Sequence, residues 1–159
     1  NKIISIRHED RAPLKVDEIC SAVINLSSRK EGALIVIQRS SDLTLHLQGS
    51  TKLNSDIFGP LIEATFHKDN SMHDGGMYIA IGRVRAVRCV LPVTQRNDIP
   101  AELGMRHRAA LGLAEKTDAL IIVVSEETGL ISIAMDGELH RGIATNDLQE
   151  IVEKELKPR

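Results

Sequence analysis

Three short stretches of the sequence group polar residues that a packed core does not require, and each could take part in chemistry. The first is His73-Asp74-Gly75-Gly76, directly before an apolar run typical of a strand. A carboxylate can bind a divalent metal or accept a proton, and glycines allow close approach of a ligand to the backbone or a positive φ. Taken alone, the same four residues also fit an ordinary turn.

The second stretch is LGMRHRAA, from Leu103 to Ala110, in which Arg106 and Arg108 flank His107 just before a helical pattern. Backbone N–H groups at the start of a helix favour anions, and arginine adds paired donors that match phosphate oxygens. The stretch therefore predicts a phosphate-binding cradle, in which His107 could donate a hydrogen bond to phosphate or orient a neighbour. A solvated basic turn with a structural histidine remains an equal alternative.

The third stretch is Ser125-Glu126-Glu127-Thr128-Gly129, which follows the most apolar strand pattern of the chain. Ligands usually bind at the strand ends of a covered sheet, because the crevice there is open while the sheet faces are not. An exposed acidic turn is the alternative. Taken together, an acid that can bind metal and cations that can bind phosphate indicate nucleotide chemistry better than they indicate folding.

Four segments show the spacing of apolar residues typical of an amphipathic helix. Gly32 is expected to end the first of them, and Ser55 or Asp56 is expected to cap the second, which carries Pro60 in its early turns. The predicted helices are Val16–Lys30, Ser55–Lys68, Ala109–Lys116 and Thr145–Lys157.

Seven further segments are typical of strands. The first two are expected to pair with each other, and the next two to form a hairpin whose second strand ends at Pro92. The predicted strands are Ala33–Gln38, Leu43–Gly49, Met77–Ile81, Val84–Val93, Ala119–Ser125, Leu130–Met135 and Glu138–Ile143. These elements predict an α/β (α+β mixed) fold, with a central mixed sheet of about seven strands covered on both faces by about five helices.

Length and composition narrow the class of protein. A chain of 159 residues with 42% hydrophobic content predicts a single domain spanning residues 1–159. A net charge of −2, 2% aromatic residues and no tryptophan argue against a general nucleic-acid binder. Cys20 and Cys89 are far apart and lack a metal-binding spacing, so they are expected to be buried thiols of a reducing, cytoplasmic protein.

The sequence contains no apolar run of the roughly 20 residues that span a bilayer and no signal peptide. It begins at Asn1 instead of Met, so we expect a domain cut from a longer protein. Attachment to a membrane is then expected only through segments outside this chain.

At this point the sequence resembles the diadenylate cyclase domain family, which includes the N-terminal domain of DisA-like proteins. The likeness lies in LIEATFHKDNSMHDGG and in the long block LGMRHRAALGLAEKTDALIIVVSEETGLISIAMDGELHR, and it covers about residues 32–142. Members carry an Asp-Gly-Ala motif and an Arg-His-Arg motif, usually within Gly-Thr-Arg-His-Arg. The resemblance implies that two ATP are condensed into cyclic di-AMP and two pyrophosphates.

Carried onto this chain, the resemblance assigns roles around the first motif. Asp74 would bind a catalytic Mg²⁺ or Mn²⁺ and help to activate the attacking 3′-hydroxyl, with His73 as a further ligand. Gly75 and Gly76 would let the nucleotide lie against the strand entrance. Leu91 stands where the family holds adenine through main-chain hydrogen bonds.

The other two motifs receive the phosphate-binding roles. Arg106, His107 and Arg108, with the backbone from Met105 to Ala109, would hold the triphosphate. Ser125 and Glu126 would close the site, and Glu127 is the expected second acid. A face-to-face homodimer is implied, because one site holding one ATP cannot supply both reaction partners.

Two residues depart from the family pattern. Gly76 replaces the usual Ala and makes the backbone looser, and Met105 replaces the usual Thr and removes a hydroxyl worth about 1 kcal/mol if it bonds phosphate. Catalysis is still expected. The alternatives are a nucleotide sensor that binds ATP or cyclic di-AMP without turnover, a purely structural dimerisation domain, and a different nucleotidyl transferase.

Overall fold

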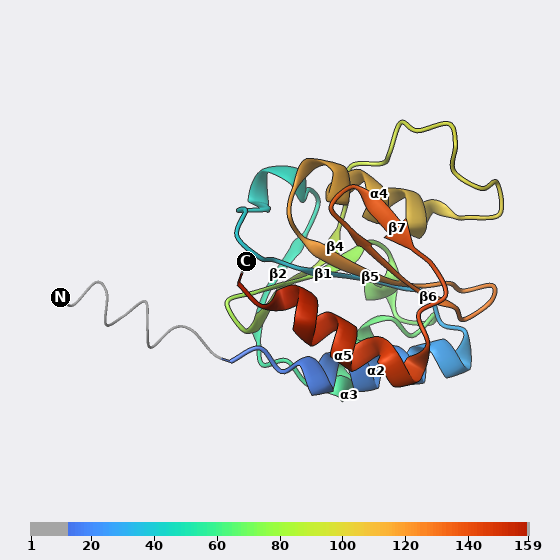
Figure 1. Cartoon of the computed structure of the whole chain (residues 1–159). Helices are drawn as coiled ribbons and strands as arrows, with labels where there is room; N and C mark the ends of the chain where they lie inside the picture. The colour runs from blue at the N-terminus through green and yellow to red at the C-terminus, as the bar shows by residue number, and fades with distance from the viewer. Residues whose placement is uncertain (1–12, 159) are drawn as a thin grey trace.

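The computed structural model describes residues 13–158, which form one seven-stranded sheet with helices on both faces (Figure 1). The α-helices are α2 (Val16–Arg29), α3 (Gly59–Thr65), α4 (Met105–Lys116) and α5 (Thr145–Leu156). Two short 3₁₀ helices, η1 (Thr44–His46) and η2 (Ser71–His73), lie in the connections. The predicted α/β architecture is confirmed, with four α-helices among the described residues.

The sheet is mixed, with strand order β2-β4-β3-β1-β5-β6-β7. Its strands are β1 (Ala33–Ile37), β2 (Thr51–Ser55), β3 (Gly76–Ala80), β4 (Arg83–Cys89), β5 (Leu120–Val124), β6 (Ile131–Met135) and β7 (Glu138–His140). Only β1 and β3 pair in parallel, and every other neighbouring pair is antiparallel. The starts of β1 and β3 therefore lie at the same end of the sheet as the finishes of β4 and β5.

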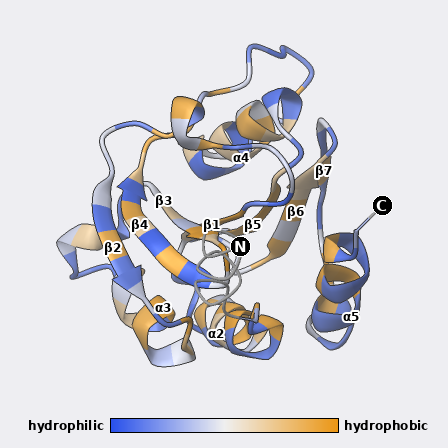
Figure 2. Ribbon diagram, turned by 90° about the vertical axis from the view of Figure 1, so that its left-hand side faces the viewer, coloured by the Kyte–Doolittle hydropathy of each residue, from blue (hydrophilic) through white to orange (hydrophobic). Residues whose placement is uncertain are grey.

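Burial on both faces explains why the central strands are continuous apolar runs. All five residues of β1 and all five of β5 are buried. On one face α2, α3 and α5 pack against the sheet, and on the other face α4 packs over the alternate side chains of the same strands. Figure 2 shows these two layers of helices with the apolar central strands between them.

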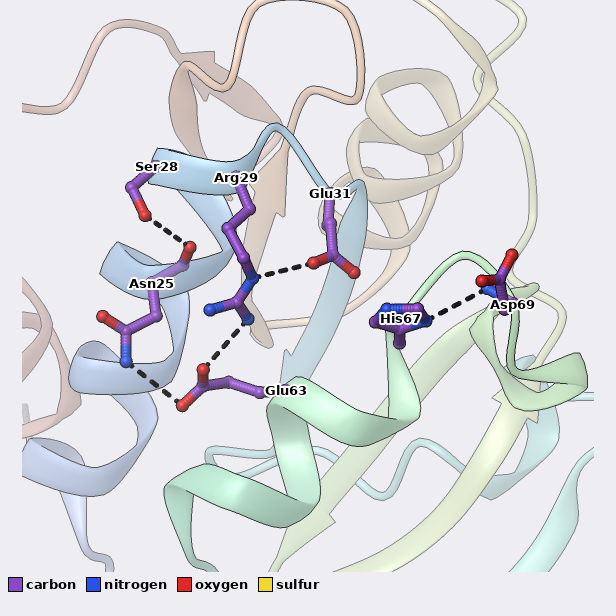
Figure 3. A network of polar contacts seen from close by, with 7 residues as sticks. All are labelled: Asn25, Ser28, Arg29, Glu31, Glu63, His67 and Asp69. Atoms are coloured by element: carbon purple, nitrogen blue, oxygen red, sulfur yellow. Dashed lines mark hydrogen bonds and ion pairs between the residues drawn. The ribbon is translucent and has the colours of Figure 1, made fainter.

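Helix α3 is joined to α2 by a polar contact as well as by apolar packing. Glu63 accepts hydrogen bonds from Arg29 at 2.9 Å and from Asn25 at 3.2 Å, and Arg29 also donates to Glu31 at 2.8 Å (Figure 3). These residues are partly exposed, so we expect them to orient the two helices more than to stabilise them.

Two predicted helix ends are wrong. Helix α2 ends at Arg29, because Lys30 takes the left-handed conformation at φ 54° and the Lys30 and Glu31 amides bond back to Ser27 and Leu26. Gly32 lies beyond this cap. Helix α3 begins at Gly59, and its N-cap residue makes no side-chain hydrogen bond.

The two residues predicted to cap α3, Ser55 and Asp56, make other contacts. Ser55 is the last residue of β2, where it pairs with Val84 of β4, and Asp56 binds Arg83 at 2.6 Å. Pairing with β4 therefore overrides the local capping signal. Pro60 does lie in the first turn of α3, as predicted.

The predicted strand at Leu43–Gly49 is also wrong. Asp42 accepts hydrogen bonds from the backbone N–H and the hydroxyl of Thr44, and this local turn starts η1. The alternation of apolar residues arises because Leu43 and Leu47 pack against the core while Leu45 faces solvent. Strand β2 follows this segment and pairs with β4, not with β1.

Two further boundaries differ from prediction. Strand β4 ends at Cys89, three residues before Pro92, and only an isolated bridge between Val90 and Gln48 continues the pairing. Helix α4 begins at Met105 instead of Ala109. The Arg-His-Arg stretch consequently forms the first turn of a helix.

Cys20 and Cys89 are free and buried, as predicted. Burial raises the pKa of the Cys20 thiol to about 12 and that of the Cys89 thiol to about 11. Among residues 13–158, no helix combines the length and the apolar character needed to cross a bilayer.

Candidate active site

Asp74 lies between η2 and β3, at the end of the sheet where β1 and β3 begin. Its side chain is 80% exposed, and its Oδ1 lies 3.2 Å from Nε2 of His73. His73 Nδ1 lies 2.7 Å from the backbone oxygen of Asn70. Because a carbonyl only accepts, Nδ1 carries the hydrogen, and Nε2 faces the Asp74 carboxylate. Metal-binding histidines adopt this arrangement, with the far nitrogen donating to a carbonyl.

The two glycines after Asp74 allow β3 and β4 to approach each other. Gly75 has φ +77°, and a Cβ there would lie 2.7 Å from the carbonyl oxygen of Cys89. A Cβ on Gly76 would lie 3.2 Å from Leu91 and 3.4 Å from Leu34. The space beside these glycines is therefore filled by the protein itself. Leu91, which the resemblance places at the adenine, packs directly beside Gly76.

The start of α4 forms one wall of a small cavity of about 100 Å³. The opposite wall is the turn after β5. The lining residues are Glu102, Gly104, Met105, Arg106, His107, Val124, Ser125, Glu126 and Glu127. The cavity is large enough for one phosphate group, and it joins the second and third stretches identified in the sequence.

Arg106 crosses this cavity. Its Nη1 lies 3.5 Å from Oε2 of Glu126, and a Cβ on Gly32 would lie only 2.7 Å from its guanidinium carbon. Its Nε is buried and has no hydrogen-bond partner among the described residues. A buried, unsatisfied donor of this kind calls for a further partner, and an anion in the cavity would supply one.

His107 is 7% exposed, and its Nδ1 is also without a partner among residues 13–158. Burial and the nearby guanidinium groups of Arg141 and Arg106 lower the pKa of His107. The ring is therefore neutral at pH 7 and can donate one hydrogen bond and accept another.

Ser125 organises the acidic turn. Its hydroxyl accepts hydrogen bonds from the backbone N–H groups of Glu127 and Thr128, each at 3.2 Å, and Gly129 N–H donates to its backbone oxygen. Glu126 faces Arg106 across the cavity, whereas the Glu127 backbone is held and its side chain is exposed.

Not every predicted residue lines the cavity. Arg108 donates to the backbone oxygens of Leu103 at 3.3 Å and Pro100 at 3.5 Å, so it holds the loop before α4. Ala109 is buried in the core beneath the helix. Asp74 and its neighbours lie at the same end of the sheet but outside the cavity wall.

Several lining residues were not predicted. Glu102, Gly104 and Val124 line the cavity, and Gly32 supports Arg106 from below. Gly104 precedes a helix without a side-chain cap, which leaves its N–H groups open, and this could be read from the sequence. Gly32 carries no such signal, because its contact with Arg106 joins residues that are distant in the chain.

Comparison with known proteins identifies the family of this chain. Residues 20–139 match the family described as DisA bacterial checkpoint controller nucleotide-binding. The chain is 45% identical over 122 residues to "Diadenylate cyclase CdaS" of Bacillus thuringiensis (strain BMB171), covering 77% of this chain and 61% of the relative. It is 35% identical over 149 residues to "Cyclic di-AMP synthase CdaA" of Bacillus subtilis (strain 168), covering 94% of this chain and 55% of the relative. The chain thus spans less than two thirds of these relatives.

Two solved structures share the fold. DacA from Staphylococcus aureus, as an N166C/T172C double mutant, superposes with a TM-score of 0.86 at 33% identity, covering 90% of this chain and 95% of that one. A structure titled as a hypothetical membrane spanning protein from Bacillus cereus gives a TM-score of 0.78 at 43% identity, covering 80% of this chain and 63% of that one.

Proposed function

Because this chain belongs to the diadenylate cyclase (DAC) family, we propose that it condenses two ATP into one cyclic di-AMP with release of two pyrophosphates. The observation that carries the proposal is the cavity at the start of α4, where Arg106 and His107 present buried, unpartnered nitrogens. These are the groups that a triphosphate would satisfy.

The phosphate-binding role falls on the first turn of α4. Arg106 supplies positive charge, and the free N–H groups after Gly104 supply donors, so the cavity would hold one phosphate of the departing pyrophosphate. Neutral His107 donates one hydrogen bond without adding charge. Glu126 holds the Arg106 guanidinium across the cavity, and Glu127 stands at the rim as the second acid.

Asp74 and His73 supply the other half of the chemistry. Their oxygen and nitrogen atoms suit a divalent cation, and no third His, Cys, Asp or Glu among the described residues joins them in a metal-binding group. Nucleotide phosphates commonly complete such a set. Bound there, Mg²⁺ or Mn²⁺ would neutralise developing phosphate charge and favour ionisation of the 3′-hydroxyl. Asp74 would also orient that hydroxyl toward the α-phosphate.

The exposure of Asp74 supports a reaction between two protomers. Its carboxylate is largely open to solvent and lies outside the cavity that contains Arg106. In a two-fold dimer with these ends facing, Asp74 of one protomer would meet the nucleotide held by the other. Two such meetings supply the two bonds of the ring.

We place the domain in the cytoplasm, where ATP is available, with any membrane attachment made by segments outside this chain. The Bacillus cereus structure titled as membrane spanning supports such a tether.

The test is incubation of the purified chain with ATP and Mg²⁺ or Mn²⁺ over a range of protein concentrations, followed by chromatography of the products. Cyclic di-AMP is expected to form with a steeper than linear dependence on protein, and the Asp74→Asn variant should form none while still binding ATP. Binding of ATP without product under either metal would favour the sensor. Absence of binding would favour a purely structural module.

A further inference from the structure

A second cavity, of about 420 Å³, lies on the same face of the sheet as α4 but over its other half. Its walls come from η1, the segment after it, and strands β2, β3 and β4. It shares no residue with the cavity at the start of α4. Its size falls within the range of roughly 300–1,000 Å³ usual for small-molecule sites. We name it the β2–β4 cavity.

Strand pairing brings two cations together at this cavity. Lys52 of β2 pairs with Ala86 of β4, and Ala86 pairs in turn with Tyr78 of β3. The register between β3 and β4 slips directly after Tyr78, because the next pair is Ile79 with Val84, and Arg85 is the extra residue. A bulge re-aims the side chain of its extra residue. Arg85 consequently lines the cavity together with Lys52.

Neither cation is neutralised by the rest of the described chain. Lys52 and Arg85 make no side-chain hydrogen bond or ion pair with any residue from 13 to 158. Arg83, two residues earlier on β4, shows the usual alternative, since it binds Asp56 at 2.6 Å and Asn54 at 2.8 Å. Two unpaired cations beside one cavity favour an anion.

The other residues that line the cavity favour a ligand that has an apolar part as well as a negative charge. Leu47 and Leu53 contribute apolar surface, and Thr44 also lines the cavity, with its hydroxyl donating to Asp42. The Tyr78 hydroxyl already donates to Gln38, and burial and the Asp42 carboxylate raise the pKa of Tyr78, so it stays neutral. Cys89 also lines the cavity, but burial keeps its thiol protonated. The cavity wall therefore presents positive charge at Lys52 and Arg85 and apolar surface at Leu47 and Leu53.

We propose that the β2–β4 cavity is a binding site for a small organic anion, with its phosphate, sulfonate or carboxylate group between Lys52 and Arg85 and its apolar body against Leu47 and Leu53. The site is separate from the nucleotide cavity and does not depend on the proposed cyclase reaction.

The test uses 1-anilinonaphthalene-8-sulfonate, which carries a sulfonate on an aromatic body, as the probe. Binding to the whole chain is followed by fluorescence and by amide chemical shifts in NMR spectra. We expect one saturable site whose shifts include Lys52, Tyr78 and Arg85. The Lys52→Glu and Arg85→Glu variants should each raise Kd about tenfold or more, whereas Lys154→Glu, which makes the same charge change on exposed α5, should not.

Two further measurements keep the outcome decisive. N-Phenyl-1-naphthylamine, which lacks the sulfonate, should bind weakly and without regard to Lys52 or Arg85. Saturating ATP, added to the Asp74→Asn chain to prevent turnover, should leave probe binding unchanged. Shifts confined to the start of α4, or competition by ATP, would place the probe in the nucleotide cavity and overturn the proposal. The NMR map of the unaltered chain gives this answer even if a variant fails to fold.

Discussion

Arg106 depends on a residue that is far away in the chain. Gly32, just before β1, leaves room for the guanidinium, and Glu126 holds it from the turn after β5. The functional geometry of one side chain is thus set by residues from three elements. A substitution at Gly32 can therefore test whether activity depends on the position of Arg106.

The Gly32→Ala variant is expected to displace the Arg106 guanidinium, because the new methyl group would lie 2.7 Å from its central carbon. The end of an arginine side chain moves easily, so the fold should persist. We expect kcat/KM for ATP to fall about tenfold, corresponding to the loss of one charge-assisted hydrogen bond of about 1.5 kcal/mol.

Steady-state kinetics check this expectation, and the melting temperature of the variant serves as its control. Unchanged kcat/KM in a variant of normal stability would show that Arg106 does not need its present position.

His107 makes stability depend on pH in a defined window. Burial, Arg141 and Arg106 lower its pKa in the folded chain, whereas in the unfolded chain it returns to about 6.5. Below pH 6.5, His107 takes up a proton in the unfolded chain but not in the folded chain. The free energy of unfolding therefore falls as the pH falls from 6.5 toward the lowered folded pKa. Above pH 6.5 this group contributes no pH dependence.

Urea unfolding between pH 5 and 7 measures this effect. The His107→Gln variant should lose stability less steeply as the pH falls, while His140→Gln, at an exposed position of β7, should keep the original slope. Equal slopes for all three chains would contradict the assignment.

At the scale of elements, α4 is positioned by close contact with the segment after β4. Gly112 lies where a Cβ would come within 2.0 Å of the Pro92 oxygen, and the Thr94 N–H donates to the Arg108 oxygen at 3.0 Å. This contact links Leu91, just before Pro92, to the helix that carries Arg106. These contacts therefore fix the position of Leu91 relative to Arg106, the two parts of the proposed nucleotide site.

The Gly112→Ala variant should destabilise the protein, although alanine is the better helix former by about 1 kcal/mol. Backbone must move to admit the methyl group, so we expect a net loss of about 1–3 kcal/mol in the free energy of unfolding. Urea denaturation measures it. Gly104→Ala, which meets nothing within 4 Å, should cost under about 1 kcal/mol. A more stable Gly112→Ala chain would show that the contact is loose.

A substitution at the C-terminal cap of α2 is expected to stabilise the protein. Lys30 holds a left-handed conformation that residues other than glycine adopt at a cost. Lys30→Gly should therefore raise the free energy of unfolding by about 0.5–1 kcal/mol, again measured in urea. A decrease would mean that contacts of the Lys30 side chain outweigh the backbone strain.

At the scale of the whole molecule, strand order decides which motifs meet. Parallel β1 and β3 start at the end of the sheet where antiparallel β4 and β5 finish. Asp74, Leu91 and the 125–127 turn consequently lie along one end, with the start of α4 beside them. Asp74 stays exposed there, as the proposed reaction between two protomers would require.

Mixing two inactive variants tests that arrangement. Asp74→Asn and Arg106→Ala chains, each inactive alone, should exchange subunits to form a dimer with one intact pair, Arg106 from the first variant and Asp74 from the second. We expect a single condensation, which yields the linear dinucleotide and one pyrophosphate, with no cyclic di-AMP. If Asp74 served the nucleotide of its own protomer, no intact site would form and chromatography would show unreacted ATP.

The fold class and the three polar stretches could be predicted from the sequence alone. Apolar runs such as ALIVI and LIIVV predict strands buried on both faces, and residues next to each other in the chain, such as His73 and Asp74, stay together in any fold. Errors arose where long-range pairing competed with local signals. Ser55 resembles a helix cap but pairs with β4, and the alternation from Leu43 to Gly49 reflects packing beside a 3₁₀ turn.

The contacts among the predicted site residues could not be predicted from the sequence, because they depend on how distant segments pack. The tertiary structure turned Arg108 toward the loop before α4, set Arg106 between Gly32 and Glu126, and used Gly75 to bring β3 against β4. It also joined Lys52 and Arg85 through a bulge that no residue pattern reveals. The physical reason is that residue type and local spacing act within a few positions of the chain, whereas these contacts arise from strand order, register and close packing between distant segments.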